Sequence, residues 1–241
     1  MTRLLTCAVA AAALLACAGT AAAQSAPAPT PSVRGDWSFA FGAATDNRSK
    51  DASKSDGQAY VWAQTEWNSA SSLVYAGAGF ETIRSSTGSH LELEAGVGLR
   101  PDVAGFDLDL NATYKQQVDA DPGTDDDAWE FTADAMRSIG PASGRLRLQY
   151  SPDGTGSVEA WTWYEAQIGW AFTDRLQASA AIGRREQDNS DDYTGWNAGL
   201  TFAVTNSLEA ELRYHATDAA DVPHANERYS DSLVAGISVA F

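Results

Sequence analysis

The segment YSDSLVAGISVAF, residues 229–241, alternates between two kinds of side chain. One face carries Leu233, Ala235, Ile237, Val239 and Phe241, and the other carries Ser232, Gly236, Ser238 and Ala240. Because successive residues of a strand point to opposite faces, this period of two predicts a β-strand with one apolar side. A chain that ends on such a strand is typical of a transmembrane barrel, whose exterior contacts lipid and whose interior contacts water.

The same alternation recurs along much of the chain. In residues 91–100, 106–115, 145–150 and 208–215, apolar residues occupy one face and charged or polar residues occupy the other. Residues 72–84 are less clear, because Leu73 and Tyr75 compete with Val74 and Phe80 for the apolar face. No segment after residue 18 approaches the roughly 20 apolar residues of a membrane helix. A closed barrel is then the spanning structure that satisfies every backbone group.

We expect an all-β fold, an antiparallel transmembrane β-barrel of twelve strands. The predicted strands are 35–46, 58–68, 72–84, 89–100, 104–117, 128–138, 143–151, 157–172, 174–186, 193–204, 207–217 and 229–241. A ten-strand barrel is the alternative, in which the strands on either side of Gly140 and Pro141 form an irregular hairpin outside the bilayer.

The predicted connections alternate between short turns and longer loops, as in bacterial outer-membrane barrels, where the short turns are periplasmic. An even number of strands then puts both chain ends in the periplasm. Aromatic residues gather near both predicted rims, as expected of rings at membrane interfaces. The periplasmic group is Trp37, Trp67, Phe106, Trp170, Phe172, Phe202 and Phe241, and the outer group is Tyr114, Trp129, Tyr150, Trp196 and Tyr214.

The N-terminus has the three-part plan of a secretory signal peptide, with Arg3, an apolar run and Ala23 before the expected cleavage point. We therefore expect a signal peptide at 1–23, a disordered periplasmic leader at 24–34 and the barrel at 35–241. Lipidation at Cys17, within a lipobox-like LLAC stretch, is the alternative. Under the preferred cleavage both cysteines, Cys7 and Cys17, are removed with the signal peptide, which excludes disulfides and thiol chemistry in the mature protein.

The chain has 32 acidic and 16 basic residues and a net charge of −16. Nucleic acid is excluded as a partner, because contacts with phosphates need a basic surface. The placement of the acids along the strands is more informative than their total.

Short stretches in two predicted outer loops resemble the TorF-type family of outer-membrane porins of proteobacteria. These stretches are ATDNRS at 44–49 and SKSDG at 53–57 in the first loop, and YSPD at 150–153 and WY at 163–164 around the fourth. The family usually carries Arg-Gly where this chain has Lys50 and Asp51, and an aromatic-Pro stretch where it has residues 119–123. The resemblance implies a small porin barrel and does not carry over a ligand.

The parity of the predicted strands places eleven acidic and six basic residues on the lumen side, an excess of five negative charges. The pore-lining acids are Glu66, Glu92, Glu94, Asp107, Asp109, Glu130, Asp134, Glu159, Glu165, Glu209 and Glu211, and the bases are Arg100, Lys115, Arg145, Arg147, Arg185 and Arg213. An open pore of this kind favours cations. Charges that pair across strands would instead fill the lumen, since twelve strands lie between filled and open barrels.

Two groups of side chains on the predicted inner wall, one charged and one aromatic, have more than one interpretation. Arg145 and Arg147, beside Glu130 and Asp134, form either a transverse field at a constriction or a ladder of salt bridges. Inward aromatic residues provide either a stacking track for planar solutes or simple lumen filling, and we favour filling. These aromatic residues are Tyr60, Trp62, Trp161 and Trp163.

The sequence offers little material for catalysis or metal binding. The acidic loop at 119–127 matches no calcium-loop spacing, and a solvated loop is the simpler interpretation. The three histidines are His90, His215 and His224. His215 points inward close to the outer rim, with Ser230 and Ser232 on the next predicted strand. A lipid hydrolase built on His215 is a remote alternative. We expect no cofactor, no metal site and no enzymatic activity.

We therefore predict a barrel in the bacterial outer membrane that lets small hydrophilic solutes or cations diffuse through a narrow acidic lumen. Its partners are outer-membrane lipids, lipopolysaccharide and the solutes, and it is either a monomer or a homotrimer. The alternative is a non-conducting barrel that displays acidic loops for adhesion or envelope integrity.

Overall fold

The structure is a computed structural model that describes residues 36–221 and 227–241. The predicted signal peptide, the leader at 24–34 and His224 lie outside the described residues. Within the described part, no helix is both long and apolar enough to cross a membrane.

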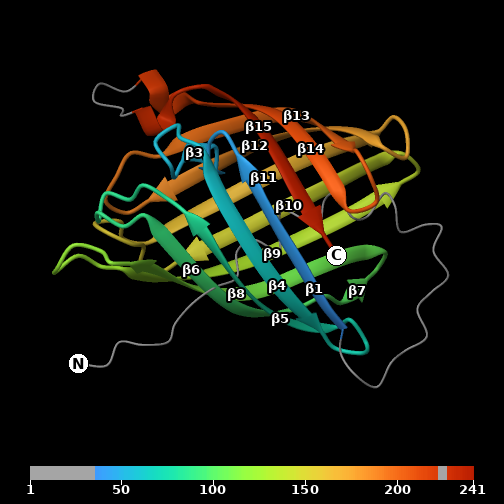
Figure 1. Ribbon diagram of the computed structural model, residues 1–241, viewed down its shortest axis with the longest axis horizontal. Helices are drawn as coiled ribbons and strands as arrows, with labels where there is room; N and C mark the ends of the chain where they lie inside the picture. The colour runs from blue at the N-terminus through green and yellow to red at the C-terminus, as the bar shows by residue number, and fades with distance from the viewer. Residues whose placement is uncertain (1–35, 222–226) are drawn as a thin grey trace.

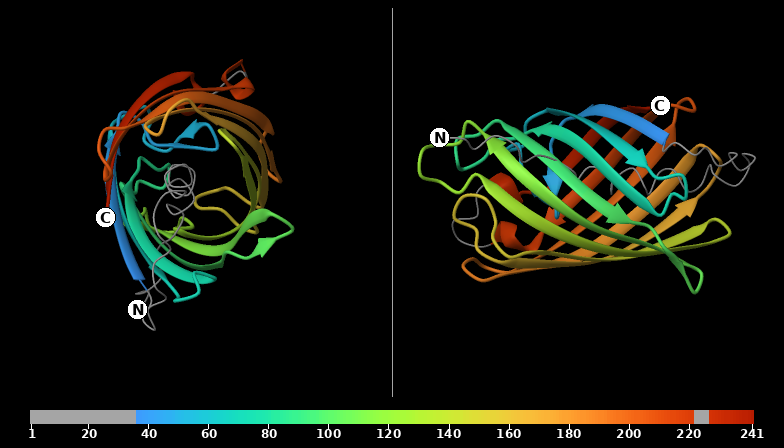
Figure 2. Two further views of the ribbon diagram at one scale, coloured as in Figure 1. Left: turned by 90° about the vertical axis from the view of Figure 1, so that its right-hand side faces the viewer. Right: turned by 90° about the horizontal axis from the view of Figure 1, so that it is seen from below.

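Twelve long antiparallel strands form a closed barrel, as Figures 1 and 2 show. They are β1 (Asp36–Ala44), β4 (Tyr60–Asn68), β5 (Val74–Thr82), β6 (Leu91–Leu99), β8 (Phe106–Val118), β9 (Asp127–Ile139), β10 (Ala142–Ser151), β11 (Trp161–Ala171), β12 (Leu176–Gln187), β13 (Tyr193–Ala203), β14 (Leu208–Thr217) and β15 (Ser232–Ala240). Each strand pairs with the next one in this order, and β1 pairs with β15. The prediction of twelve strands is confirmed.

The seam between β1 and β15 closes the sheet. Ala40 pairs with Ala240, and the pairing continues to Ala44 opposite Gly236. Beyond β15, the amide of Phe39 donates to the carbonyl of Phe241 at 2.9 Å, and the Phe241 amide donates back to Phe39 at 3.0 Å. The C-terminal strand predicted from its alternation therefore removes both free edges of the sheet.

The outer face of the barrel wall carries the apolar side chains, as predicted. On β15 the outward Leu233, Ile237 and Phe241 are 62%, 52% and 70% exposed, which is the surface that lipid would cover in a transmembrane barrel. On β5 the ambiguity is resolved, because Val74 and Phe80 are exposed outside while Tyr75 is buried inside. The ring of Tyr75 occupies space beside Gly98, where a Cβ atom would lie 2.3 Å from it.

The ten-strand alternative is wrong, because β9 and β10 pair along their length from Ile139 opposite Ala142. The turn between them is only residues 140–141, and Gly140 takes the positive φ of 59° that this tight reversal needs.

The predicted strand at 157–172 begins later, at Trp161. Glu159 therefore lies in the connection before β11 with an exposed side chain, and its expected place on the inner wall is wrong. The period of two extends back to residue 157, but the chain there follows a loop that Asn189 holds, accepting the Glu159 amide at 3.3 Å.

The connections alternate in length with one exception. The short turns are 69–73, 100–105, 140–141, 172–175 and 204–207, and the loops at the opposite end are 45–59, 83–90, 119–126, 152–160, 188–192 and 218–231. Only 188–192 is as short as a turn. We call these the short-turn end and the long-loop end. Smaller elements not predicted are β2 (Arg48–Ser49), β3 (Ala52–Ser53), β7 (Asp102–Val103), and the 3₁₀ turns η1 (Asp218–Asp221) and η2 (Glu227–Tyr229).

A charge on the outer face should destabilise the barrel in a membrane far more than a charge on the inner face. Leu146 lies near the middle of β10, is 64% exposed and is flanked by Ala135 and Ala166. We expect Leu146→Arg to cost about 2–4 kcal/mol of unfolding free energy in lipid vesicles, measured by urea titration. The control is Gln167→Arg on the inner face of β11, expected to cost under about 1 kcal/mol. Equal losses for the two variants would contradict the assigned faces.

Candidate functional site in the barrel lumen

The charged residues predicted for the inner wall, apart from Glu159, lie on the inward parity of their strands or, for Arg100, directly after one. Most of the bases among them are held by acids of neighbouring strands. Three groups of these ion pairs follow one another from the short-turn end to the long-loop end, and a further pair joins Arg213 to Glu211 within β14 at 2.7 Å.

At the short-turn end, Arg100 joins three strands. Its guanidinium donates to both carboxylate oxygens of Glu66 on β4 at 2.7 and 2.8 Å, and to Asp109 on β8 at 3.0 Å. The same guanidinium lies 3.8 Å from the ring centroid of Tyr75, whose hydroxyl donates to Asp109 at 2.5 Å. One arginine is thus shared by two acids and packed on an aromatic face, a geometry that suits arginine better than lysine.

In the middle of the barrel, two arginines of β10 bind acids on the strands to either side. Arg147 donates to both oxygens of Asp134 on β9 at 2.8 and 2.6 Å, and Arg145 donates to Glu165 on β11 at 2.5 Å. Arg147 binds Asp134 as the ladder of salt bridges predicts, whereas the acid bound by Arg145 is Glu165, and the predicted partner Glu130 pairs with Lys50 and Lys115.

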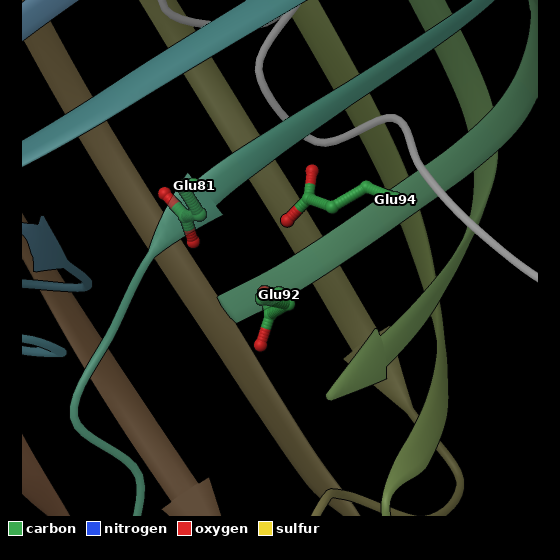
Figure 3. A group of neighbouring side chains, drawn as sticks. All are labelled: Glu81, Glu92 and Glu94. Carbon is green, nitrogen blue, oxygen red and sulfur yellow. The ribbon is translucent and has the colours of Figure 1, made fainter. Parts of the chain in front are cut away.

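Toward the long-loop end, Glu81, Glu92 and Glu94 point toward one another from β5 and β6 (Figure 3). Their nearest oxygens lie within 4.8 Å of one another, a spacing that a cation could bridge. Two lysine ammonium groups lie at this cluster. Lys115 of β8 is 3.0 Å from Glu94, and Lys54 is 2.6 Å from Glu92 and also bonded to Glu81. Because these lysines already compensate the carboxylates, the cluster gives no reason to place a metal ion there.

Glu81 was missed from the sequence because the parity of its strand was ambiguous. Its partner across the sheet is Glu92, a residue predicted to be inward. The register of that hairpin was the signal that could have identified it, because residues directly opposite each other share a face.

Lys54 comes from the first long loop, which folds into the barrel. Residues 45–59, the inserted hairpin, contain the two-residue strands β2 and β3 and lie inside the ring of strands (Figure 2, left). Asp46, Asn47, Ser53 and Ser55 of this segment are at most 3% exposed. Asp46 accepts hydrogen bonds from the hydroxyls of Ser53 and Ser55 at 2.6 and 2.8 Å, which closes the hairpin upon itself.

The tip of the inserted hairpin is strained. Lys50 and Asp51 have φ values of 54° and 62°, so both central residues of this two-residue turn are left-handed, as in a type I′ turn. Asn and Gly are the usual residues there, and a left-handed non-glycine residue costs about 1–2 kcal/mol. The contacts of these two side chains with the barrel wall offset the cost.

Each side of the tip binds a different part of the wall. Lys50 Nζ is 3.6 Å from Glu130 on β9 and 4.1 Å from the ring centroid of Trp161 on β11. Asp51 Oδ1 is 2.8 Å from His215 Nδ1 on β14 and accepts from Asn197 on β13 at 2.9 Å.

The backbone of the tip is held as well. The Tyr193 hydroxyl donates to the Lys50 carbonyl at 2.9 Å. Gly195 leaves room for the tip, since a Cβ atom there would lie 2.7 Å from the Cβ of Asp51. A larger residue on this part of β13 would therefore push the hairpin away.

The two lysines of the inserted hairpin have opposite pKa shifts. Burial lowers the pKa of Lys50 to about 7, and the attraction of Glu130 only partly opposes this. Burial also disfavours the charged form of Lys54, but the carboxylates of Glu81 and Glu92 outweigh it and raise the pKa of Lys54 above its ordinary value.

The inward aromatic residues of β11 fill space, as the favoured prediction had it. Trp163 is 1% exposed and lies against Gly183, where a Cβ would be 2.1 Å from its ring. Trp161 lies beneath the amino group of Lys50 and the guanidinium of Arg185, whose distances to its ring centroid are 4.1 and 4.7 Å. Neither ring offers an open face in this arrangement.

The remaining chemical candidates of the sequence have structural contacts. His215 binds Asp51 of the hairpin through Nδ1. The acidic loop at 119–126 packs against the neighbouring loop, where the Asp121 amide donates to the Thr87 carbonyl at 2.7 Å.

Comparison with known proteins identifies the fold and a sequence family. The family model Gcw_chp, described as a bacterial protein of unknown function, matches residues 37–241. No curated protein sequence matches the chain.

The solved structures that resemble the chain include three porins or outer-membrane proteins. The KdgM porin has a TM-score of 0.58 at 8% identity over 85% of this chain and 99% of its own, and its complex with disordered oligogalacturonate has a TM-score of 0.59 at 7% identity and the same coverage. The NanC porin has a TM-score of 0.54 at 8% identity over 86% of this chain and 99% of its own. Omp33, an outer-membrane protein of Acinetobacter baumannii, scores 0.50 at 9% identity over 87% and 99%. At these identities the likeness establishes the fold.

Removing Lys54 should release the inserted hairpin. The side chain is 22% exposed, so losing its pairs with Glu81 and Glu92 should cost about 1–2 kcal/mol and raise the released population about tenfold. We expect Lys54→Met to accelerate trypsin cleavage after Arg48 and Lys50, detected by mass spectrometry of the folded protein. Arg175→Met, which removes a positive charge from a turn at the other end, is the control. Unchanged cleavage in Lys54→Met would contradict the role given to this lysine.

The seating of the hairpin should depend on pH through Lys50. Between pH 7 and its ordinary pKa of 10.5, Lys50 is neutral when docked and protonated when released, so falling pH favours release across this window. The mobility of a spin label on Asp56→Cys, an exposed position of the hairpin, should therefore increase as the pH falls toward 7. Glu130, Lys115, Arg185 and the Asp51–His215 pair also face this region. Lys50→Met should flatten the response, and an unchanged slope in that variant would assign it to one of these groups instead.

Proposed function

This chain belongs to the Gcw_chp family of bacterial proteins of unknown function, and we propose that it is an outer-membrane porin for small hydrophilic solutes, with a preference for cations. The observation that carries the proposal is the distribution of side chains on the barrel wall, which is the reverse of that in a water-soluble protein. Large apolar side chains face outward all round the barrel, and charged side chains face inward along its whole length. A protein with this distribution is stable where its exterior meets hydrocarbon and its interior meets water.

The same distribution supports a location in the bacterial outer membrane. In that orientation the short-turn end faces the periplasm and the long-loop end faces outward, where its acidic loops meet lipopolysaccharide. The apolar belt would contact the lipids. Export through the periplasm requires the signal peptide expected at residues 1–23, and the resemblance of the outer-loop stretches to the TorF-type porins agrees with this assignment.

The charge of the lumen supports cations. Glu81 replaces Glu159 among the inward acids, so the strands keep their excess of five negative charges. The inserted hairpin adds three acids and three bases, so fourteen acids face nine bases and the excess stays at five. A net negative lumen attracts cations and repels anions.

The solute of one relative does not fit this lumen. The KdgM porin was solved in complex with disordered oligogalacturonate, a polymer that carries a carboxylate on each sugar. An acidic lumen disfavours such a polyanion, so we extend only the barrel fold from that comparison and not its ligand.

A non-conducting barrel that displays its loops is the second candidate, and the inserted hairpin is the observation that favours it. Its nearly fully buried residues occupy the long-loop half of the lumen and join both sides of the wall. If the hairpin never leaves, the barrel would serve adhesion or envelope integrity.

Planar-bilayer recording of the refolded mature protein separates these functions. We expect discrete conductance steps and, in a KCl gradient, a reversal potential that shows preference for K⁺. Glu209→Lys, on the inward face of β14 near the short-turn end, should reduce this preference because it shifts the lumen charge by two. Glu186→Lys, on the exposed outer parity of β12, makes the same chemical change outside the lumen and should have little effect. Absence of steps would support the non-conducting barrel, and anion preference in the parent protein would refute the cation assignment.

A further inference from the structure

We propose that the inserted hairpin, residues 45–59, is a removable plug that closes the long-loop half of the lumen and whose lysines set the ion preference of the pore. This inference rests on the proposed porin function and adds its regulation. It predicts two states of one barrel, a docked state with low conductance and a released state that is wider and more selective for cations.

The first argument is the span of the hairpin. On one side Lys54 reaches Glu81 on β5 and Glu92 on β6. On the other side Asp51 reaches Asn197 on β13 and His215 on β14. In the order of the sheet, these two pairs of strands lie on either side of the group β4, β1 and β15, and the hairpin connects β1 to β4. The contact of Lys50 with Glu130 adds a third point of attachment, on β9. A segment with contacts at these separate points crosses the lumen rather than lining one wall.

The second argument is the chemistry of the contacts. The residues of the segment, TDNRSKDASKSDGQA, include no large apolar side chain. Only Ala52 contributes to an apolar cluster, with Trp161, Trp163 and Tyr193 of the wall. Water can replace the hydrogen bonds and ion pairs that hold the hairpin, so the hydrophobic cost of release is confined to the cluster around Ala52.

The third argument is strain. Lys50, Asp51 and Asp56 all have positive φ, at 54°, 62° and 52°. Left-handed non-glycine residues of this kind persist only where surrounding contacts hold them. Release relaxes this backbone, which brings the docked and released states closer in free energy than the number of contacts implies.

The fourth argument is the way in which the hairpin is attached. It begins and ends where β1 and β4 stop pairing, at Ala44 opposite Tyr60. Beyond this point Thr45 is still tied to the closing seam, since its amide donates to the Ala235 carbonyl at 2.9 Å. The residues that move on release therefore lie outside the hydrogen-bonded strand pairs of the barrel, and release leaves the closure of the sheet intact.

Release also changes the charge of the lumen. It withdraws Lys54 from Glu81 and Glu92, and Lys50 from Glu130. Among the described residues, Lys115 then remains as the ion-pair partner of Glu92 and Glu130. The hairpin carries three acids and three bases, so its release leaves the net formal charge of the lumen unchanged. The wall around Glu81, Glu92 and Glu130 nevertheless becomes more negative locally as the pore widens, so conductance and cation preference should rise together.

A reversible covalent lock tests the proposal. Asp51→Cys with Gly195→Cys places two thiols across the contact, where the Cβ atoms would be 2.7 Å apart. A disulfide needs about 3.5–4.5 Å, so a shift of the tip by about 1 Å accommodates it. The mature protein expected after cleavage at Ala23 has no other cysteine, and the same molecules can be recorded before and after reduction. Asp51→Cys alone controls for effects of the reductant.

We expect low conductance in the oxidised double variant. Reduction should raise conductance severalfold and increase the permeability ratio of K⁺ to Cl⁻, because Asp51 no longer holds the tip. Equal conductance and equal selectivity in the two redox states would overturn the proposal. The variant Lys50→Met/Lys54→Met keeps no lysine on the hairpin and introduces no cysteine. We expect its cation preference to exceed that of the parent and to be the same with and without the reductant.

A second readout keeps failure of the plug distinct from failure of the porin function. Trypsin cleavage after Arg48, Lys50 and Lys54 is measured on the folded Asp51→Cys/Gly195→Cys variant, once oxidised and once reduced. Protection that is lost on reduction, in a barrel that conducts in neither state, refutes the porin function and not the movement of the hairpin. Cleavage that is the same in both states, in a barrel that conducts, refutes the plug and leaves the porin function standing.

Discussion

The pairing of β1 with β15 is the constraint on which the rest of the structure depends. In a membrane, every unpaired backbone group at the edge of a sheet faces hydrocarbon, so the sheet is stable only when its last strand meets its first. The reciprocal bonds between Phe39 and Phe241 complete that closure at the short-turn end. Once the sheet is closed, the parity of each strand decides which side chains meet lipid and which enter the lumen.

Closure also explains why the lumen is so highly paired. Twelve strands enclose a narrow interior in which a lone charge is poorly solvated, so acids and bases gather in local groups. Arg100 serves Glu66 and Asp109, and Arg147 holds Asp134. The carboxylates near the long-loop end exceed the bases that the strands provide, and the inserted hairpin supplies lysine ammonium groups to them. A loop that supplies counter-charges to the wall is at the same time an obstacle in the pore.

Much of the fold could be predicted because a period of two is a local property of the chain. Twelve strands, the lipid-facing set of β15 and most of the inward charges follow from it directly. The prediction was wrong at Glu159, where alternation persists outside a strand, and it stayed open at Tyr75, where two parities compete. Glu81 was missed for the second reason, since only pairing with Glu92 assigns its face.

The amino-acid sequence by itself determined the alternation of the strands, their number and the shared parity of most of their charged residues. Tertiary structure alone decided that residues 45–59 fold inward, that Lys54 joins Glu81 and Glu92, and that Asp51 meets His215. The physical reason is the range of each interaction. Strand parity is set by neighbours in the chain, whereas the hairpin binds residues up to 190 positions away, which become neighbours only after the sheet has closed.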